Sequence, residues 1–380
     1  MGSAKRQVCL PTTQSSYSAE VLCERQKIVA LENAGLLLPQ LRQHLNQTKF
    51  FLASISPKVW SPRVVAVRQA GHVIGFLHAK ERTAGGIGTG IVFGDATLDG
   101  LVAAEPEHRG AVFRAGLEAL LKRRRTLGVR LLLRPDGYEL ETLRVSLQPF
   151  NVDYELTDAQ HHLLLTLGPS YDDFMSRLGP KTRRNFRYYR RKSEAEGYSY
   201  VENIPLEEFS RASDELLKQQ VVGADRNGVD RALAMFAQAQ RPVLSGLRDK
   251  NGAWLSLLGG WIDGARPVIF FQMNSDKSHS KSSLCLVLRG YVFETLIQMG
   301  MRSVVFWAGV GEPLNRYSRP VAAVSVYVDK RQMVWSGVRH LVANAVRRLP
   351  RNMAWRADWI VANRDRGREL NIYAPQSEMG

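Results

Sequence analysis

The amino-acid sequence predicts an α/β protein in which mixed β-sheets are flanked by helices, with two such units in tandem. Segments that alternate apolar and polar residues are interspersed with segments whose apolar residues recur at helical spacing, which is typical of this class. Each half of the chain also contains a β-hairpin followed by a helix, a glycine and a strand. The length of 380 residues suits two domains of ordinary size.

The first half is predicted to contain a helical region, one β-hairpin, a further helix and two further strands. The hairpin is indicated by the alternation around Gly71, and the glycine-rich run after it lacks the spacing of a P-loop. The expected elements are, in order, a loose polar arm at 1–16, a helical region at 17–52 that is broken near Gly35 and Pro39, a hairpin at 64–80 that turns at 69–71, a loop and edge strand at 84–95, a helix at 111–125 and a strand at 130–134.

The second half is predicted to repeat this plan after a run of helices. Ser170 and Asp173 have the spacing of a helix N-cap, and Gly179-Pro180 interrupts the helix that they begin. The expected elements are, in order, a very basic helix that ends near Gly197, helices at 206–220 and 231–240, a hairpin at 243–262 that turns at 250–252, a strand at 267–273, a polar loop at 274–283, a helix at 284–299 that is apolar nearly all round, and a strand at 303–307.

The two halves match where the apolar helix of each is followed by a strand. Gly128 in the first half and Gly300 in the second are each followed by an apolar residue, an arginine and a strand. A glycine just after a helix typically supplies a left-handed C-cap, and we expect this of both. Any helix-to-strand connection could look similar, but the preceding hairpins at comparable distances favour a tandem duplication.

The composition favours proteins that bind anionic partners. The formal net charge is +16, from 52 Lys and Arg against 36 Asp and Glu, and the isoelectric point is near 10. Residues 177–192 contain eight Lys or Arg and no acid, and residues 301–356 contain ten bases and two acids. The charge is therefore concentrated in two segments, which favours phosphate-bearing ligands, nucleic acid or an anionic membrane surface.

The cysteines and histidines predict neither disulfides nor a metal site. Cys9, Cys23 and Cys285 are scattered, and the histidine pair at 161–162 leads into an apolar run, where a structural role is expected. No secretory signal or membrane-spanning segment is evident, since the most apolar helical stretch carries Arg289 and Glu294. A reduced, cytoplasmic protein is expected, with peripheral contact to the inner membrane as an extension of that hypothesis.

Two segments resemble a known family. The basic helix contains Lys181-x-Arg183-x-Asn185-x-Arg187 and ends in Glu194-x-x-Gly197, and the second half ends in Gly309-x-Gly311-Glu312 after the last strand. Together with the helix at 284–299, this resembles the tandem GNAT-like acyltransferases of the cellulose-biosynthesis (CelD-like) and Fem-related group. The resemblance covers roughly residues 165–320 and implies a degenerate GNAT-like domain at 17–165, a GNAT-like acyltransferase domain at 166–330 and a basic C-terminal extension at 331–380.

The resemblance implies an acyl-CoA or acyl-carrier thioester as co-substrate, without a metal. A strand, a polar loop and the start of a helix together offer free backbone N–H groups to a phosphate, so the donor would bind there. The alternative is that the serines are only N-caps. The candidates for donor binding are Lys277, Lys281, Ser282, Ser283 and Leu284.

No Ser-His-Asp or Cys-His arrangement is evident, which favours direct transfer to an amine, or less favourably a hydroxyl, over a covalent acyl-enzyme. Glu312 is the candidate base and Tyr317 the candidate acid. Each residue could instead have a structural role. Glu312 could be a turn residue beside Pro313, and Tyr317 could be an aromatic side chain at the edge of the hydrophobic core. The substrate-binding candidates are Gln272, Asn274 and Asn315.

Three departures from the family pattern bear on activity. Trp307 stands where many members have an acidic residue, and Arg316 replaces a lysine. In the first half, Val112 and Arg114 occupy the positions of small residues in a phosphate turn, so that a pyrophosphate could not approach the backbone closely. We expect the first domain to be a non-catalytic partner.

The basic helix supports further hypotheses about partners. Its cations could contact RNA phosphates, including those of an aminoacyl-tRNA donor as in Fem-like transferases, or anionic lipid head groups; they could also simply face solvent. A glycan-linked, lipid-linked or small-molecule amine is the expected acceptor, in envelope or polysaccharide biosynthesis. The alternative to an enzyme is a non-catalytic GNAT-like binding protein for RNA or an anionic surface. The anion-binding candidates are Arg183, Arg184, Arg187, Arg190 and Arg191.

Overall fold

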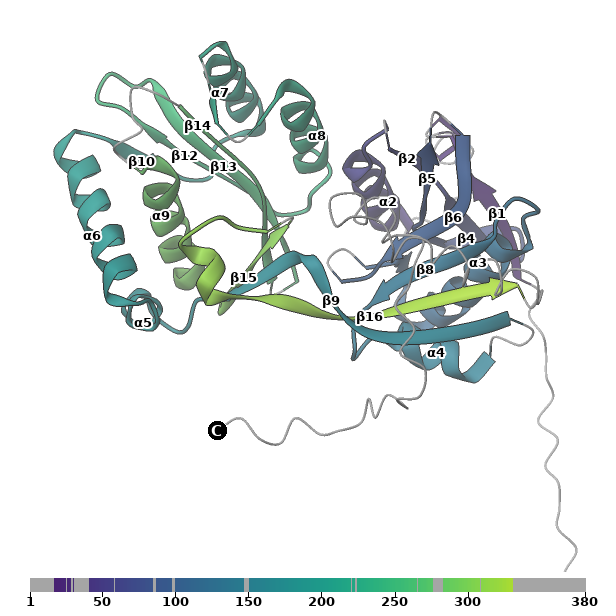
Figure 1. Cartoon of the computed structure of the whole chain (residues 1–380). Coiled ribbons are helices and arrows are strands. Elements are labelled where there is room, and N and C mark those ends of the chain that lie inside the picture. The colour runs from purple at the N-terminus through teal and green to yellow at the C-terminus, as the bar shows by residue number, and fades with distance from the viewer. Residues whose placement is uncertain are drawn as a thin grey trace, which may run out of the picture.

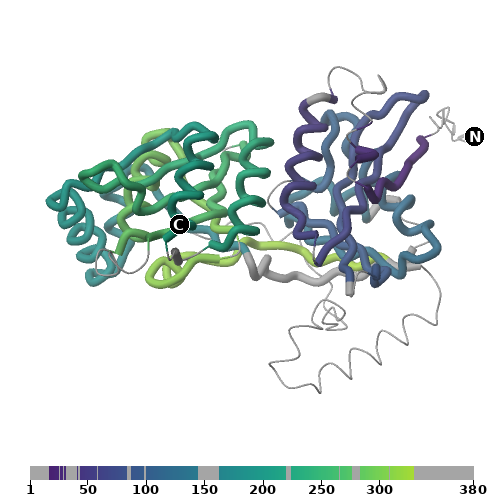
Figure 2. Tube along the Cα trace, turned by 90° about the horizontal axis from the view of Figure 1, so that it is seen from above, coloured from purple at the N-terminus to yellow at the C-terminus, as the bar shows by residue number. Residues whose placement is uncertain are grey.

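The computed structural model describes residues 17–330, apart from 25, 29, 31–40, 58, 85–86, 98–99, 147–149, 220, 223, 265, 276–282 and 308. The described chain forms two lobes that stand side by side and are joined by two long strands, β9 (Phe150–Thr166) and β16 (Ser318–Lys330) (Figures 1 and 2). The polar arm at 1–16 and the basic extension at 331–380 lie outside the described residues.

The first lobe is built from the N-terminal half of the chain. Helices α3 and α4 pack into one hydrophobic core of this lobe. Helix α2 packs into a second, separate core. Its elements are β1 (Tyr17–Leu22), α2 (Arg42–Ser54), β2 (Trp60–Pro62), β3 (Val64–Gln69), β4 (His72–Leu77), β5 (Lys80–Ala84), β6 (Ile87–Asp95), β7 (Val102–Ala104), η2 (Pro106–His108), α3 (Arg109–Lys122), β8 (Gly128–Leu133) and α4 (Tyr138–Ser146).

The second lobe has helices on both faces of its sheet. Helices α5, α6 and α9 lie on one face, and α7 and α8 cover the other face, which is the side turned toward the first lobe (Figure 1). Its elements are α5 (Tyr171–Arg177), α6 (Pro180–Ala195), β10 (Ser199–Val201), α7 (Leu206–Lys218), β11 (Val221–Val222), α8 (Arg226–Phe236), β12 (Pro242–Arg248), β13 (Trp254–Asp263), β14 (Arg266–Ser275), α9 (Leu284–Gln298), β15 (Ser303–Trp307) and η4 (Leu314–Tyr317).

One sheet of twelve strands passes through both lobes. Its order is β10-β12-β13-β14-β15-β9-β16-β8-β6-β5-β2, with β11 added to β14, and a separate four-stranded sheet has the order β1-β3-β4-β7. Strand β9 pairs with β15 near its end, where His162 is opposite Trp307, and β16 pairs with both β9 and β8. Parallel and antiparallel pairs occur in the same sheet, so the predicted fold class, a mixed sheet flanked by helices, is confirmed.

Because β9 and β16 run through both lobes, the lobes are not two consecutive stretches of the chain. The predicted boundary near residue 165 falls at the end of β9, which has already entered the second lobe. Strand β16 returns to the first lobe, where Val324, Val326 and Val328 are fully buried in the core beneath α3. Each lobe therefore contains chain from the other half of the sequence.

Two expectations for the first half are wrong. Residues 17–22 form β1 instead of helix, because Tyr17 to Leu22 pair antiparallel with β3 and pack against α3. This long-range pairing outweighs the local pattern. The glycine-rich run forms β6, which lies between β5 and β8 in the interior of the sheet and is not an edge strand.

The turn chemistry of the sequence was predicted more accurately. The first hairpin turns at Ala70 and Gly71, both with positive φ, as a type I′ turn requires. Gly300 has φ +82° and ends α9, with the Met301 N–H donating to the Leu296 carbonyl at 2.9 Å, so the predicted left-handed C-cap is confirmed. The same prediction for Gly128 is wrong, because this glycine begins β8 and leaves room for the Tyr327 ring.

Candidate functional site

Strands β14 and β15 separate after a short parallel contact. Their register contains only two pairs, Val268 with Val305 and Ile269 with Phe306. Further along, β14 pairs on this edge with β11, through Asn274 and Ser275. Within the described part of the chain, residues 270–273 of β14 thus have no strand opposite them on this edge, and we call these four residues the open stretch.

Polar side chains line the face of this region that α9 covers. The Gln272 side chain donates from Nε2 to the Cys285 carbonyl and accepts from the Cys285 thiol, both at 3.3 Å. The Asn274 Oδ1 accepts from the Ser256 hydroxyl at 2.6 Å. The predicted substrate-binding residues Gln272 and Asn274 are therefore held in place by β13 and by the first turn of α9.

The first turn of helix α9 contacts β14 near the end of that strand, through Cys285 and Gln272. Ser283 precedes the helix in a left-handed conformation, with φ 47°, and its carbonyl accepts from the N–H groups of Leu286 and Val287. Its side chain forms no cap hydrogen bond. Leu284 is buried at the first helical position. The other three donor-binding candidates, Lys277, Lys281 and Ser282, lie outside the described residues.

Beside Gln272, α9 presents a thiol and a guanidinium that the sequence had not singled out as functional. Burial raises the pKa of Cys285. One turn later, Arg289 places its guanidinium over the Phe306 ring, 5.5 Å from the centroid, and burial lowers the pKa of this arginine. Its Nε is inaccessible to solvent and has no hydrogen-bond partner in the described part of the chain. The sequence did contain one signal for this pair, namely a charged residue, Arg289, in a helix that is apolar nearly all round.

The acid–base candidates lie around η4, after the end of β15. Glu312 is exposed and forms an ion pair with Arg316 Nε at 2.9 Å, and Asn315 is also exposed. The Tyr317 hydroxyl accepts from the Gly179 N–H at 3.0 Å and is 3.1 Å from the Thr182 hydroxyl. These two hydrogen bonds lower the pKa of Tyr317, with the Thr182 contact the larger cause.

The predicted site residues therefore form two groups. Gln272, Asn274, Ser283 and Leu284 gather where β14 ends and α9 begins. Glu312, Asn315 and Tyr317 gather around η4, where Tyr317 contacts the start of the basic helix α6.

The arginines of α6 have unequal surroundings. Arg190 is paired with Glu294 at 2.7 Å and Glu194 at 3.2 Å, and its guanidinium lies 4.2 Å from the Tyr291 ring centroid. Arg183 is half-buried. The other three are exposed on the outer face of the helix beside Tyr188, and in the described part of the chain no carboxylate pairs with them; they are Arg184, Arg187 and Arg191.

The opposite face of the sheet carries aromatic rings where the lobes meet. Trp261 of β13 packs edge-on against Phe50 of α2 at 4.9 Å and against Trp307 at 5.5 Å, and Trp307 also meets Phe270 at 5.6 Å. The guanidinium of Arg231 lies 5.1 Å from the centroid of Phe270, and its Nε is buried without a hydrogen-bond partner. Trp307 thus belongs to an aromatic cluster at the lobe interface.

His162 connects this cluster to the first lobe. Its ring meets Trp307 edge-on at 5.5 Å, and its Nε2 lies 3.7 Å from a carboxylate oxygen of Asp95. Burial acts to raise the pKa of Asp95, but the contacts with His162 and Thr97 outweigh it and the net shift is downward. The structural role expected of His162 agrees with these contacts.

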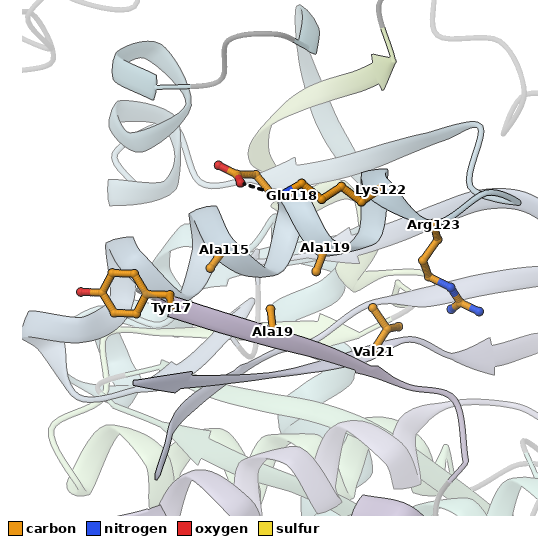
Figure 3. A pocket seen from close by; sticks show the side chains of 8 residues that line it. All are labelled: Tyr17, Ala19, Val21, Ala115, Glu118, Ala119, Lys122 and Arg123. Atoms are coloured by element: carbon orange, nitrogen blue, oxygen red, sulfur yellow. Dashed lines mark ion pairs between the residues drawn. The ribbon is translucent and has the colours of Figure 1, made fainter. Parts of the chain in front are cut away.

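A surface cavity of about 480 Å³ lies in the first lobe, away from all of these residues. Figure 3 shows it between β1 and α3, with Ala19 and Val21 facing Ala115 and Ala119 and with charged side chains at the rim. None of the predicted site residues lines it. Across the described ranges, no three His, Cys, Asp or Glu side chains gather as a metal ion would require. Among the described helices, none combines the length and the apolarity that crossing a bilayer demands.

Comparison with known proteins finds similarity in structure alone. No family model matches the sequence, and no curated protein matches it. Solved structures that match include the L-PGS from Bacillus licheniformis, 14% identical over 85% of this chain and 96% of that chain, with a TM-score of 0.47. FemX is 10% identical over 77% of this chain and 97% of that chain, with a TM-score of 0.48.

A tandem GNAT protein from the clavulanic acid biosynthesis pathway is 14% identical over 82% of this chain and 98% of that chain, with a TM-score of 0.36. Fem-related and tandem GNAT proteins, the group that two segments of the sequence resemble, are thus among the solved structures to which this chain is similar. At such identities and TM-scores, no activity or ligand of those proteins is carried over to this chain.

Proposed function

We propose that this protein is an acyltransferase that moves an acyl group directly from a CoA or carrier thioester to an amine, or to a hydroxyl. The observation that carries the proposal is the separation of β14 from β15 after two residue pairs, beside the start of α9. Backbone N–H groups along a strand edge without a partner can donate to a developing oxyanion. The start of a fifteen-residue helix favours a phosphate on the same ligand.

The reaction needs few protein groups. The neutral amine attacks the thioester carbonyl, the oxyanion forms and collapses, the C–S bond breaks, and the thiolate takes up a proton while the amine loses one. In this proposal Ser283 and Leu284, with Lys277, Lys281 and Ser282 before them in the sequence, contact the donor phosphates. Gln272, Asn274 and Asn315 orient the acceptor.

Glu312 is proposed as the base and Tyr317 as the acid. An exposed carboxylate can accept the amine proton through water, and its ion pair with Arg316 keeps it near η4. A phenol whose pKa is lowered releases its proton more readily to a thiolate, which supports the role of Tyr317.

Binding of the full-length protein to acetyl-CoA, longer acyl-CoAs, an acyl carrier and aminoacyl-tRNA tests the donor, by calorimetry and thermal shift. We expect saturable binding of a CoA thioester and thiol release on addition of an amine acceptor. Binding of aminoacyl-tRNA alone would contradict the thioester donor and favour a Fem-like transferase. Absence of binding to every donor would contradict the proposal.

The Glu312→Gln variant tests the base. We expect about a 100-fold lower rate of thiol release with donor affinity unchanged, because general base catalysis typically contributes a factor of this order. The matched control is Glu107→Gln, which changes an exposed glutamate of the first lobe. Equal rates for wild type and Glu312→Gln would remove Glu312 from the mechanism.

We propose as a second candidate that α6 docks on an anionic membrane surface. Arg184, Arg187 and Arg191 recur on the outer face of the helix, free of carboxylate partners among the described residues, with the exposed ring of Tyr188 between them. Sedimentation with vesicles that contain anionic lipid should decrease steeply with salt and with reversal of all three charges to Glu. Arg190→Glu is not a matched control, because Arg190 holds two carboxylates. Arg211→Glu is the matched control, because Arg211 is an exposed arginine of α7 for which the described residues provide no ion pair. Salt-independent sedimentation would contradict this role.

A further inference from the structure

Arg289 of α9 is a partly buried cation to which the described residues offer no partner. Its Nε is hidden from solvent and unbonded, and within the described ranges no ion pair or hydrogen bond involves the rest of its guanidinium. Withdrawing a cation from water is costly unless an anion or hydrogen-bond acceptors replace the water. An arginine kept in this state is typical of a site that receives its counter-charge from a ligand.

The immediate neighbours of Arg289 do not compensate its charge. The Phe306 ring offers only its face, at 5.5 Å. The Cys285 thiol donates to Gln272, and burial raises the pKa of Cys285, so that it stays protonated and neutral. Gln272 is bonded through both its amide nitrogen and its oxygen to Cys285. The polar groups on this wall are therefore neutral and satisfied by one another.

The position of Arg289 places it at the base of the open stretch. Phe306, beneath its guanidinium, is the last residue of β15 that pairs with β14. Cys285, one turn earlier on the same face of α9, is bonded to Gln272, which lies within the open stretch. A ligand that entered between the separated strands would therefore reach Arg289 with its innermost part.

We propose that the ligand of this site presents an anionic oxygen group, a carboxylate or a phosphate, to Arg289. The inference rests on the proposed acyl transfer and names a class of donor for it. A carboxylate would come from the distal end of a dicarboxylic acyl group, and a phosphate from the ligand's own phosphoryl group. A planar guanidinium binds either group through paired charge-assisted hydrogen bonds.

Arg231 provides a matched control on the other face of the same sheet. It is also an arginine with a buried, unbonded Nε, and it also lies over a phenylalanine, Phe270. Although Phe270 is the first residue of the open stretch, Arg231 reaches its ring from α8, on the face turned toward the first lobe, whereas Arg289 projects from α9 on the opposite face. A loss of binding that followed only from removing a buried positive charge would appear equally in both variants.

Calorimetry with succinyl-CoA, acetyl-CoA and inorganic phosphate, on the full-length wild type and the variants Arg289→Met, Arg289→Lys and Arg231→Met, tests the proposal. For a carboxylate, wild type should bind succinyl-CoA about tenfold or more tightly than acetyl-CoA. For a phosphate, both thioesters should bind alike and inorganic phosphate should bind wild type. In either case Arg289→Met should lose the part of the binding affinity that depends on the anion. Arg289→Lys should retain some of that affinity, and Arg231→Met should retain all of it.

Equal responses of wild type and Arg289→Met to succinyl-CoA and to phosphate would overturn the proposal, as would the same loss in Arg231→Met. Melting temperatures of the unliganded variants verify that each one folds. If wild type binds neither thioester, the acyl-transfer proposal fails separately, and the phosphate titration still decides whether Arg289 receives an anion.

Discussion

At the scale of single residues, the buried polar groups of the second lobe differ from those of the first in how they are satisfied. In the first lobe, Thr48 donates to the His44 carbonyl and is 2.9 Å from His78 Nε2, and His44 in turn contacts Glu105 at 3.1 Å. This chain of contacts has a partner at every step. Arg289 and Arg231 in the second lobe have none for their Nε atoms among the described residues. Satisfied groups stabilise the fold, whereas an unsatisfied one requires its own explanation. For Arg289 we propose a ligand, and Arg231 lies over Phe270 at the lobe interface.

His78 should make the stability of the protein depend on pH. Burial, and to a smaller extent the charge of His44, lowers the pKa of His78 to about 4. Since an unfolded histidine titrates near 6.5, only the unfolded state binds a proton between the two values, and stability is lost as the pH falls through that range. The loss should reach about 3 kcal/mol near pH 4.

Urea unfolding at pH 7, 5.5 and 4.5 measures this effect. The difference in slope between wild type and His78→Gln isolates His78 from the other titrating groups. The control is His72→Gln, which replaces an exposed histidine of the same hairpin and should retain the wild-type slope. Identical slopes for wild type and His78→Gln would show that His78 is already protonated or solvated in the folded protein.

At the scale of elements, the start of α6 depends on a residue 138 positions later in the chain. Gly179 precedes the helix and has no side chain to cap it, and Pro180 follows. The Tyr317 hydroxyl accepts from the Gly179 N–H and contacts Thr182, so the cap comes from η4. A methyl group on Gly179 would lie 2.8 Å from that hydroxyl, which explains the glycine. Helix α6 and the residues after β15 are therefore coupled.

Tyr317→Phe should destabilise the protein by about 1 kcal/mol, because it removes the acceptor for an N-terminal N–H group of α6. Thermal unfolding gives the stability, and amide exchange in the first turn of α6 reports where it is lost. Tyr188→Phe, which removes a hydroxyl from a residue that is 54% exposed on the same helix, is the control. A Tyr317→Phe protein as stable as wild type would mean that water replaces the hydroxyl.

At the scale of the whole molecule, the two lobes share strands, a core and an ion pair. Phe50 of the first lobe belongs to the core of the second, where it packs against Trp261. Arg134 at the end of β8 lies 3.7 Å from Asp263 at the end of β13, and burial raises the pKa of Asp263. Together with β9 and β16, these contacts predict that the lobes unfold together.

Phe50→Ala tests this coupling, since it removes a side chain that is 7% exposed at the lobe interface. We expect a loss of about 3 kcal/mol in the free energy of unfolding, and one transition in wild type that broadens in the variant. Ile87→Ala, which truncates a side chain that is 76% exposed, should change the stability by less than about 0.5 kcal/mol. Two separate transitions in wild type would contradict the coupling.

Elements whose signals are local could be predicted from the order of the amino acids alone. The hairpin around Gly71, the cap at Ser170, the break at Gly179-Pro180 and the left-handed Gly300 all follow from turn and cap chemistry over a few residues, and β15 was predicted with its observed bounds. The helix at 284–299 and the strand before it, which frame the candidate site, were predicted in the same way.

The folded structure was needed for features that depend on residues distant in the chain. It decided that residues 17–22 form a strand, because β3 offers a pairing edge, and that β16 returns to the first lobe. It placed the Tyr317 hydroxyl at the start of α6 and the Gln272 side chain at the first turn of α9. It also showed that the described residues offer the Nε of Arg289 no partner, which no periodicity reveals, because the surroundings of a side chain depend on the tertiary packing.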